Sequence, residues 1–440
     1  MEFSAPELIQ ELRIASGTFE DNRTGENTRY SMEDIVLGAF SVFLTQSPSF
    51  LSFQRAMREK TGRDNAESLF SMQSLPSDDQ IRQVLDGVSP HLLFPVFEKC
   101  LDQLVANGDI RQFKSELGYL IALDGTQYHS SDTIHCKNCL TKTDKKIKEV
   151  TYYHTAITPV IVKPGNEHVL SLVPEYIKPQ DGREKQDCEI TASKRLLIAQ
   201  SKHVFKHMEV SYLGDDLYAH EPFCRAVLET GHSFIFTCKP ESHKTLYEWV
   251  SGITQKYVED RFDGKKHRLY TYTYVSGVPL RNGDNALLVN FIDVTVTDRQ
   301  RGNTLYRNAF ITNHPVTTDS LPLIVDCGRA RWKIENENNN TLKTKGYYFE
   351  HNYGHGNTGL ALVLTTLILL AFLFHTLFSL FWQPYIHMLE RVKRTRLFEA
   401  IRTLAQFYYA PNWEHLFAGM EYALDTVVTM PLPFTILPAG

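Results

Sequence analysis

The spacing of apolar residues along the chain changes at about residue 116. Before that point, from residue 31 to about 108, apolar positions recur at helical intervals, and Ser31 and Ser77 each begin a capping-box pattern. These signals predict an all-helical N-terminal domain over residues 1–115, with possible DNA-end binding as its role. About the first 30 residues are polar, and we expect them to be poorly ordered.

Beyond residue 116 the pattern becomes one of β-branched and apolar runs. It predicts three strands, a helix, a strand, a helix and a last strand. In order, these elements cover residues 117–123, 150–162, 168–173, 185–205, 209–214, 220–230 and 233–238. This order is typical of the RNase H-like fold, a mixed α/β (α+β) sheet with its active site at strand ends. We therefore predict that residues 116–238 are the first part of an RNase H-like catalytic domain.

Residues 239–325 again alternate between apolar and polar positions. Strands are predicted at 267–280, 286–296, 309–312 and 321–325, with a turn at Asn282-Gly283. We interpret this stretch as a β-rich insertion. Residues 326–440 are then expected to form a helix carrying an acidic residue, an apolar helix and a helical C-terminal region.

The apolar helix is the stretch Leu360 to Trp382, which has 23 residues and no Asp, Glu, Lys or Arg. It is long enough to span a membrane. However, its flanks are rich in Asn, Gly and His before and in Arg and Lys after, and the sequence has no second such run. We favour a fully buried core helix and no membrane partner, and a membrane-anchored protein using residues 360–382 is the alternative.

Composition bounds the class of protein. A chain of 440 residues with 42% hydrophobic and 22% charged residues is globular and long enough for two or three domains. The net charge of −5 does not provide the basic footprint usual in DNA-binding domains. Local basic stretches, however, can contact phosphates; they lie at residues 194–207, 265–268, 299–307 and 391–402.

The seven cysteines are an odd number spread over a long chain, which argues against a disulfide framework and for a reducing compartment. The N-terminus lacks a basic segment followed by an apolar run, so we expect no signal peptide. The sequence also has no Walker-type phosphate loop, so ATP dependence is not expected. These features predict a cytoplasmic protein.

Three acidic positions lie at the ends of predicted elements. Asp124 follows the 117–123 strand, and Asp215 and Asp216 follow the 209–214 strand. Adjacent strand residues point to opposite faces, so only one of that pair can share a site with Asp124. Glu335 stands four residues after Arg331, on the same face of a predicted helix. Carboxylates are the hard oxygen ligands of Mg²⁺ or Mn²⁺, and two such ions roughly 4 Å apart support in-line attack on a phosphodiester.

The motifs around these acids resemble those of a known family. The string Arg331-Trp332-Lys333-Ile334-Glu335 resembles the Arg-Trp-x-Ile-Glu signature of DDE transposases of bacterial cut-and-paste insertion sequences. The segment ending at Asp124 resembles their first-Asp strand, and Asp215-Asp-Leu-Tyr218 resembles their Asp-x-x-Tyr motif, which selects Asp215 over Asp216. The resemblance covers about residues 115 to 385, including the β-rich insertion.

The resemblance implies a DNA transposase that cleaves transposon ends and transfers the strands into target DNA. Asp124, Asp215 and Glu335 would be its catalytic Mg²⁺ or Mn²⁺ ligands. The implied partners are double-stranded DNA, as terminal inverted repeats and as target, and a second copy of the chain on that DNA, and the implied location is the nucleoid. A domesticated or inactive transposase that binds DNA without cutting is the alternative.

The resemblance also implies contacts to DNA. In the family the Arg of the signature binds a phosphate, which implies this role for Arg331, and the family carries a lysine seven residues after the Glu. Here Lys343 stands one residue later than that lysine, and Lys345 follows it. Trp332 can stack on a base extruded from a DNA end, and the alternative is that it packs in the core.

A Cys-x₂-Cys pair is a second candidate site. Cys136 and Cys139 have His135 beside them and His154 fifteen residues beyond, and such a set can hold a structural Zn²⁺ that staples the hairpin after Asp124. A single Cys-x₂-Cys also fits two reduced thiols in a loop, which is the interpretation we favour. The segment 346–356 contains one Glu and two His but lacks His-Glu-x-x-His. We expect it to cap the apolar helix rather than to bind a second metal.

Overall fold

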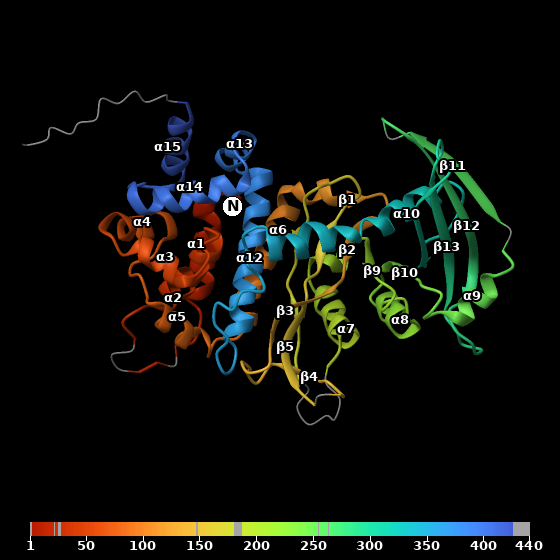
Figure 1. Cartoon of the computed structure of the whole chain (residues 1–440), viewed down its shortest axis with the longest axis horizontal. Helices are drawn as coiled ribbons and strands as arrows, with labels where there is room; N and C mark the ends of the chain where they lie inside the picture. Colours follow the sequence, from red (N-terminus) through yellow and green to blue (C-terminus); the bar gives the residue numbers. More distant parts are fainter. Residues whose placement is uncertain are drawn as a thin grey trace, which may run out of the picture. The chain divides into compact units, whose positions relative to one another are not determined.

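The computed structural model describes residues 2–21, 23–24, 28–146, 148–179, 187–253, 255–262 and 264–425. It divides into two compact units, one made from residues 1–78 with 377–440 and the other from residues 79–376. Figure 1 labels many of the elements of both. The domain boundaries expected at residues 115, 238 and 325 stay predictions.

The first unit is helical over its described residues. Its helices are α1 (Ala5–Ser16), α2 (Met32–Leu44), α3 (Phe50–Met57), α4 (Lys60–Phe70), α13 (Gln383–Arg391), α14 (Arg394–Phe407) and α15 (Trp413–Asp425). Ser31 caps α2 as predicted, because its side chain accepts the Asp34 N–H at 3.1 Å.

The poor order expected for the first 30 residues is wrong for α1. Its apolar residues recur three and four positions apart, so that Leu8, Ile9 and Leu12 are buried along one face. Pro6 stands in its first turn, where a missing N–H costs nothing. Residues 22 and 25–27 of the same stretch lie outside the described residues.

The second unit begins with helices and continues into a sheet. The helical elements are α5 (Asp78–Leu85), whose first residue belongs to the other unit, η2 (Pro90–Leu93), α6 (Phe94–Asn107) and η3 (Asp109–Phe113). Ten strands of the described chain form the larger sheet: β1 (Lys114–Ser115), β2 (Gly118–Ala122), β6 (Val160–Val162), β7 (Leu170–Ser171), β9 (Val210–Gly214), β10 (Ser233–Thr237), β11 (Lys256–Phe262), β12 (His267–Pro279), β13 (Leu288–Asp298) and β14 (Thr304–Thr312).

The order of this sheet is β11-β12-β13-β14-β10-β9-β2-β6-β7, with β1 paired to β2. The pairs β2/β9 and β9/β10 are parallel, and the others are antiparallel. The mixed α/β class is therefore confirmed. Because β2 and β9 run in the same direction side by side, the residues that follow them emerge at the same edge of the sheet.

A second sheet contains β3 (Gly125–Ser131), β5 (Val150–Ile157), β4 (Leu140–Thr143) and β8 (Glu175–Ile177). The single strand predicted at 150–162 is thus divided between two sheets, as β5 and β6. Pro159 stands at the break, where it cannot donate a ladder hydrogen bond.

The β-rich stretch after residue 239 extends the larger sheet, because β14 pairs with β10. Helices of this half of the unit are α7 (Glu189–Gln200), η4 (Val204–His207), α8 (Glu221–Glu229), α9 (Lys244–Val250), α10 (Leu321–Arg329), η5 (Ile334–Asn339) and α11 (Asn340–Thr344). The strand predicted at 321–325 is wrong. Leu321, Ile324 and Val325 are buried at helical spacing in α10, and Pro322 stands in its first turn.

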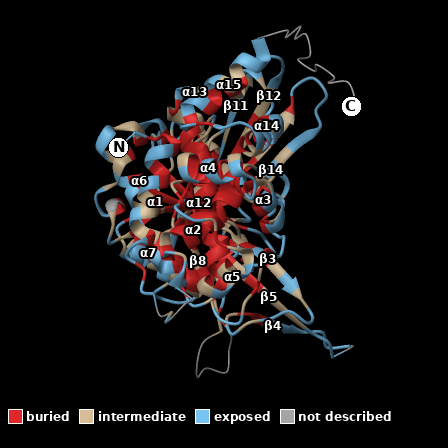
Figure 2. Ribbon diagram, turned by 90° about the vertical axis from the view of Figure 1, so that its left-hand side faces the viewer, coloured by how far each residue is buried: buried red, intermediate tan, exposed pale blue. Residues whose placement is uncertain are grey.

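The apolar stretch forms α12 (Leu360–Phe381), and the 18-residue window that would be long and apolar enough to cross a membrane is 100% buried within the chain. Figure 2 shows this helix among the buried residues. The prediction of a buried helix is confirmed. At its start, the Asp86 carboxylate accepts N–H hydrogen bonds from residues 357 to 360 at 2.9 to 3.1 Å. Further along, the Tyr176 hydroxyl of β8 donates to the carbonyl of Leu362 at 2.9 Å.

Candidate functional site

Asp124 and Asp215 follow the ends of the neighbouring parallel strands β2 and β9. Ala122 pairs with Leu213 in the sheet, and the Leu123 N–H donates to the Leu213 carbonyl at 2.8 Å. Both aspartates are half-buried. The strand ends therefore bring the first two predicted carboxylates to one edge of the sheet.

Glu335 reaches the same site from the π-helical segment η5. Its carboxylate forms an ion pair with the Arg331 guanidinium at 2.8 Å, so the two side chains lie on the same face as predicted. Four residues further, the Asn339 amide donates to Asp124 Oδ2 at 2.8 Å. Such π-helical turns are frequent at functional sites.

The pKa of Asp124 is shifted by burial and by neighbouring charges. Its pKa is raised to about 7, first by burial and then by the negative charges of Glu189, Glu335 and Asp215, while Arg331 lowers it. An acid is perturbed in this way only by charges a short distance from it. The pairing of β2 with β9 and the hydrogen bond from Asn339 to Asp124 place Asp124, Asp215 and the helical segment that carries Glu335 at one edge of the sheet, and the catalytic role of the three acids stays a prediction.

Glu189 is a fourth carboxylate of this site that the sequence analysis missed. It lies in the first turn of α7, and burial raises its pKa, as does the charge of Asp215. A β-carbon on Gly125 would lie 2.5 Å from Glu189 Oε2, so Gly125 is small enough to let this carboxylate approach the strand end. In the sequence Glu189 looks like any acidic residue at a helix N-terminus.

Tyr218, three residues after Asp215, positions the Glu189 carboxylate. Its fully buried hydroxyl donates to Glu189 Oε1 at 2.7 Å and accepts from the Ser193 hydroxyl at 3.2 Å. The ring packs so closely on the strand end that a β-carbon on Gly214 would lie 2.7 Å from it. The tyrosine after Asp215 therefore holds the fourth carboxylate in place.

Asp216 faces away from this cluster. Its carboxylate accepts the Lys239 N–H at 2.6 Å and the Ser242 hydroxyl, and it lies 3.4 Å from His243 Nε2. Asp215 instead accepts the Leu217 N–H at 2.9 Å, closing a turn at the strand end. This difference agrees with the argument that only one of the two aspartates shares a site with Asp124.

The four residues expected to contact DNA have different surroundings. Arg331 is buried beside Glu335, and its guanidinium also lies 5.1 Å from the Trp332 ring centroid. Trp332 is 46% exposed, which excludes the core-packing alternative, and it lines a surface hollow with Arg329 and Lys333. Lys343 forms an ion pair with Glu350 at 2.7 Å, and Lys345 is exposed at the end of α11.

A second cluster of candidate ligands combines residues far apart in sequence. Cys136, Cys139, His154 and His355 place their ligand atoms within 4.8 Å of one another, so the group can hold a metal ion such as Zn²⁺. The sequence prediction named three of these four. The fourth, His355, comes from the segment that we expected only to cap the apolar helix, and the favoured interpretation of two thiols in a loop omitted the two histidines.

His135, which the sequence prediction included among the possible zinc ligands, is not part of this cluster. The residue precedes Cys136 and is exposed, and its ring stacks on Tyr152 with centroids 4.3 Å apart. Its Nδ1 faces the Thr133 carbonyl at 3.1 Å.

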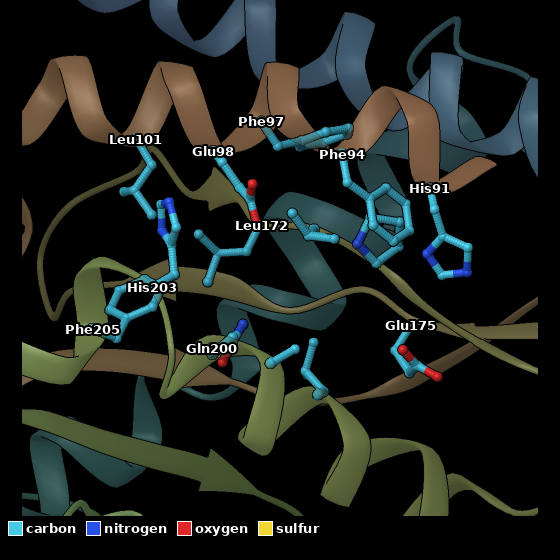
Figure 3. A pocket seen from close by; sticks show the side chains of 14 residues that line it. His91, Phe94, Phe97, Glu98, Leu101, Leu172, Glu175, Gln200, His203 and Phe205 are labelled. Atoms are coloured by element: carbon cyan, nitrogen blue, oxygen red, sulfur yellow. The ribbon is translucent and has the colours of Figure 1, made fainter. Parts of the chain in front are cut away.

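An apolar cavity of about 190 Å³ lies between α6, the segment after β7 and α7 (Figure 3). Phe94, Phe97 and Leu101 line it together with Leu172 and Leu196. None of the four clustered carboxylates lines this cavity, so it is separate from the candidate site.

No protein-family model matches the chain, and no curated protein matches its sequence.

Proposed function

We propose that this chain is a DDE-type DNA transposase, which cleaves transposon ends and joins them to target DNA. The observation that carries the proposal is the grouping of three acids. Asp124 and Asp215 follow adjacent parallel strands, and Glu335 of η5 acts on Asp124 through its charge and forms an ion pair with Arg331 of the signature.

The sheet supports an RNase H-like assignment for the catalytic domain. Read from β10 through β9, β2 and β6 to β7, the strands stand in the chain order fifth, fourth, first, second and third. The strands that come first in the chain, β2, β6 and β7, are antiparallel neighbours. The two later strands, β9 and β10, run parallel to β2. The antiparallel strands β11 to β14 then form the proposed insertion, which comes before the helix that carries Glu335.

The cluster is suited to Mg²⁺ or Mn²⁺. Its donors are hard carboxylate oxygens, and all four acids are half-buried, so they remain open to water and substrate on one side. The raised pKa of Asp124, caused by burial and by the charges of Glu189 and Glu335, reflects negative charge that a divalent cation would neutralise. When bound, two such ions activate the attacking oxygen and stabilise the leaving 3′-oxygen.

The side chains around the acids have roles in this proposal. Arg331 fixes Glu335 through the ion pair, and Asn339 fixes one oxygen of Asp124. Trp332 is exposed three residues before Glu335, and its ring can stack on a base at the DNA end. Because Arg331 is buried, it can contact a DNA phosphate only close to Glu335. Lys345 is exposed and can contact the DNA backbone.

The partners in this proposal are terminal inverted repeats, target DNA and a second copy of the chain assembled on the DNA. The protein acts on the nucleoid in the cytoplasm and needs no ATP. Short inverted repeats flanking the gene would supply the natural substrate for the assay.

A nicking assay on a labelled duplex that carries these repeats tests the proposal. Cleavage should require Mg²⁺ or Mn²⁺, and Ca²⁺ should support binding without efficient cutting. Alanine at Asp124, Asp215 or Glu335 should each abolish cleavage, while DNA binding survives because Lys and Arg contacts provide the affinity. Asp216→Ala is the matched control and should cut. Normal cleavage by all three alanine variants would exclude the proposed mechanism.

A further inference from the structure

The two cysteines lie in a tight turn between β3 and β4. The Cys139 N–H donates to the Cys136 carbonyl at 3.2 Å, and the Cys136 N–H donates back to Cys139 Sγ at 3.3 Å. This arrangement directs both sulfur atoms to the same side of the turn.

Two histidines complete the group from other elements. His154 lies on β5 and is buried, with Nε2 at 3.3 Å from Cys136 Sγ and 3.4 Å from Cys139 Sγ. His355 lies in the segment before α12 and is also buried, with Nε2 at 3.3 Å from Cys139 Sγ. The sulfur atoms are 3.9 Å apart.

These spacings agree with a tetrahedron around one ion. Zn–S bonds of about 2.3 Å and Zn–N bonds of about 2.05 Å at the tetrahedral angle place two sulfurs about 3.8 Å apart and a sulfur and a nitrogen about 3.6 Å apart. The observed separations lie within a few tenths of an ångström of these values. The distance between the two sulfur atoms is far longer than the roughly 2.05 Å of a disulfide bond.

We propose that Cys136, Cys139, His154 and His355 bind one structural Zn²⁺, which joins the β3–β5 sheet to the segment before α12. Four protein ligands leave no open position, so the ion is structural rather than catalytic. Loss of the ion would leave two thiols and two imidazoles packed together and mostly buried.

The cluster lies between the chain segments that follow Asp124 and Glu335. β3 begins at Gly125, directly after Asp124, and the segment with His355 connects the Glu335 helix to α12. Two hydrogen bonds join the same segments next to the cluster: the Lys137 backbone N–H donates to the Asn357 carbonyl at 3.2 Å, and the Asn138 side-chain amide donates to the Thr358 carbonyl. Zinc would therefore fix the chain after Asp124 against the chain after Glu335. The role of zinc in positioning the segments next to Asp124 and Glu335 rests on the proposed function, whereas the binding of zinc does not.

Metal content of the purified full-length chain tests the site without DNA or Mg²⁺. The wild type should contain one Zn²⁺ per chain, and Co²⁺ exchanged into it should give the visible absorption of a tetrahedral site with two thiolates. His355→Ala should lower Zn²⁺ affinity at least about tenfold, since even changes around a metal site cost 10- to 100-fold. The matched control is His135→Ala, which should bind zinc like the wild type.

A conservative variant separates loss of the ligand from loss of the fold. His355→Cys should keep tetrahedral Co²⁺ and increase the thiolate charge-transfer absorption, because a third sulfur replaces a nitrogen. Stripping the metal should speed hydrogen exchange at residues 136–139 and 355–359. Wild-type chain without zinc, or His355→Ala with unchanged affinity, would overturn the site. Zinc binding with no DNA cleavage would leave the site intact and count against the proposed function alone.

Discussion

Protonation of Asp124 should compete with metal binding at the carboxylate cluster. Burial, together with the charges of Glu189 and Glu335, raises the pKa of this acid to about 7. Metal binds the carboxylate form, so binding below pH 7 must first displace a proton. With a pKa of about 7, Asp124 is about nine-tenths ionised at pH 8 and about one-tenth ionised at pH 6. The apparent Kd for Mn²⁺ should therefore be about tenfold weaker at pH 6, or about 1.4 kcal/mol.

Isothermal titration of the chain with Mn²⁺, without DNA, measures this effect. Repeating each titration in two buffers of different ionisation enthalpy gives the protons released, which should be close to one at pH 6 and close to none at pH 8. Asp216→Asn is the control and should keep the pH dependence, because Asp216 faces Lys239 and Ser242 rather than the cluster. An equal Kd at pH 6 and pH 8 in the wild type would refute the reasoning.

Three substitutions test the groups that support the cluster. Glu189→Gln removes one negative charge beside Asp124, so the pH midpoint of Mn²⁺ binding should fall below that of the wild type; an unchanged midpoint would place Glu189 outside the cluster. Tyr218→Phe removes the hydrogen bond to Glu189 and should destabilise the chain by about 1–3 kcal/mol in urea unfolding, and no loss would contradict its positioning role. Asn339→Ala frees one oxygen of Asp124 and should lower the cleavage rate about 10- to 100-fold, whereas alanine at the exposed Asn336 should not.

The sequence predicted the strand ends that carry Asp124 and Asp215 because both follow short apolar runs. Such runs become buried strands, and the first polar residue after each emerges at the sheet edge. The same reasoning predicted a strand at 321–325, where a short apolar run forms α10 instead. Short apolar segments do not distinguish strand from helix by periodicity alone.

The Asn-rich stretch after Glu335 shows where propensity fails. Asparagine is a poor helix former, yet the chain stays helical from Ile334 to Thr344. Asn338 is fully buried and donates to the Thr158 hydroxyl at 3.1 Å, and Asn339 donates to Asp124. These tertiary hydrogen bonds outweigh the local preference.

Glu189 and His355 could not be found from local patterns. Glu189 joins the cluster only because α7 packs beside the strand ends, and nothing in its neighbours distinguishes it from an ordinary first-turn acid. His355 stands 216 residues after Cys139, beyond any ligand-spacing motif. Both positions depend on chain folding over long sequence separations.

The most direct test of the central claim is the position of Mn²⁺ in a crystal of the chain bound to its terminal-repeat duplex. Anomalous scattering should locate Mn²⁺ between Asp124, Asp215 and Glu335, next to the phosphate at the DNA end. Mn²⁺ bound at Asp216 instead, or a DNA end held away from these three carboxylates, would contradict the account.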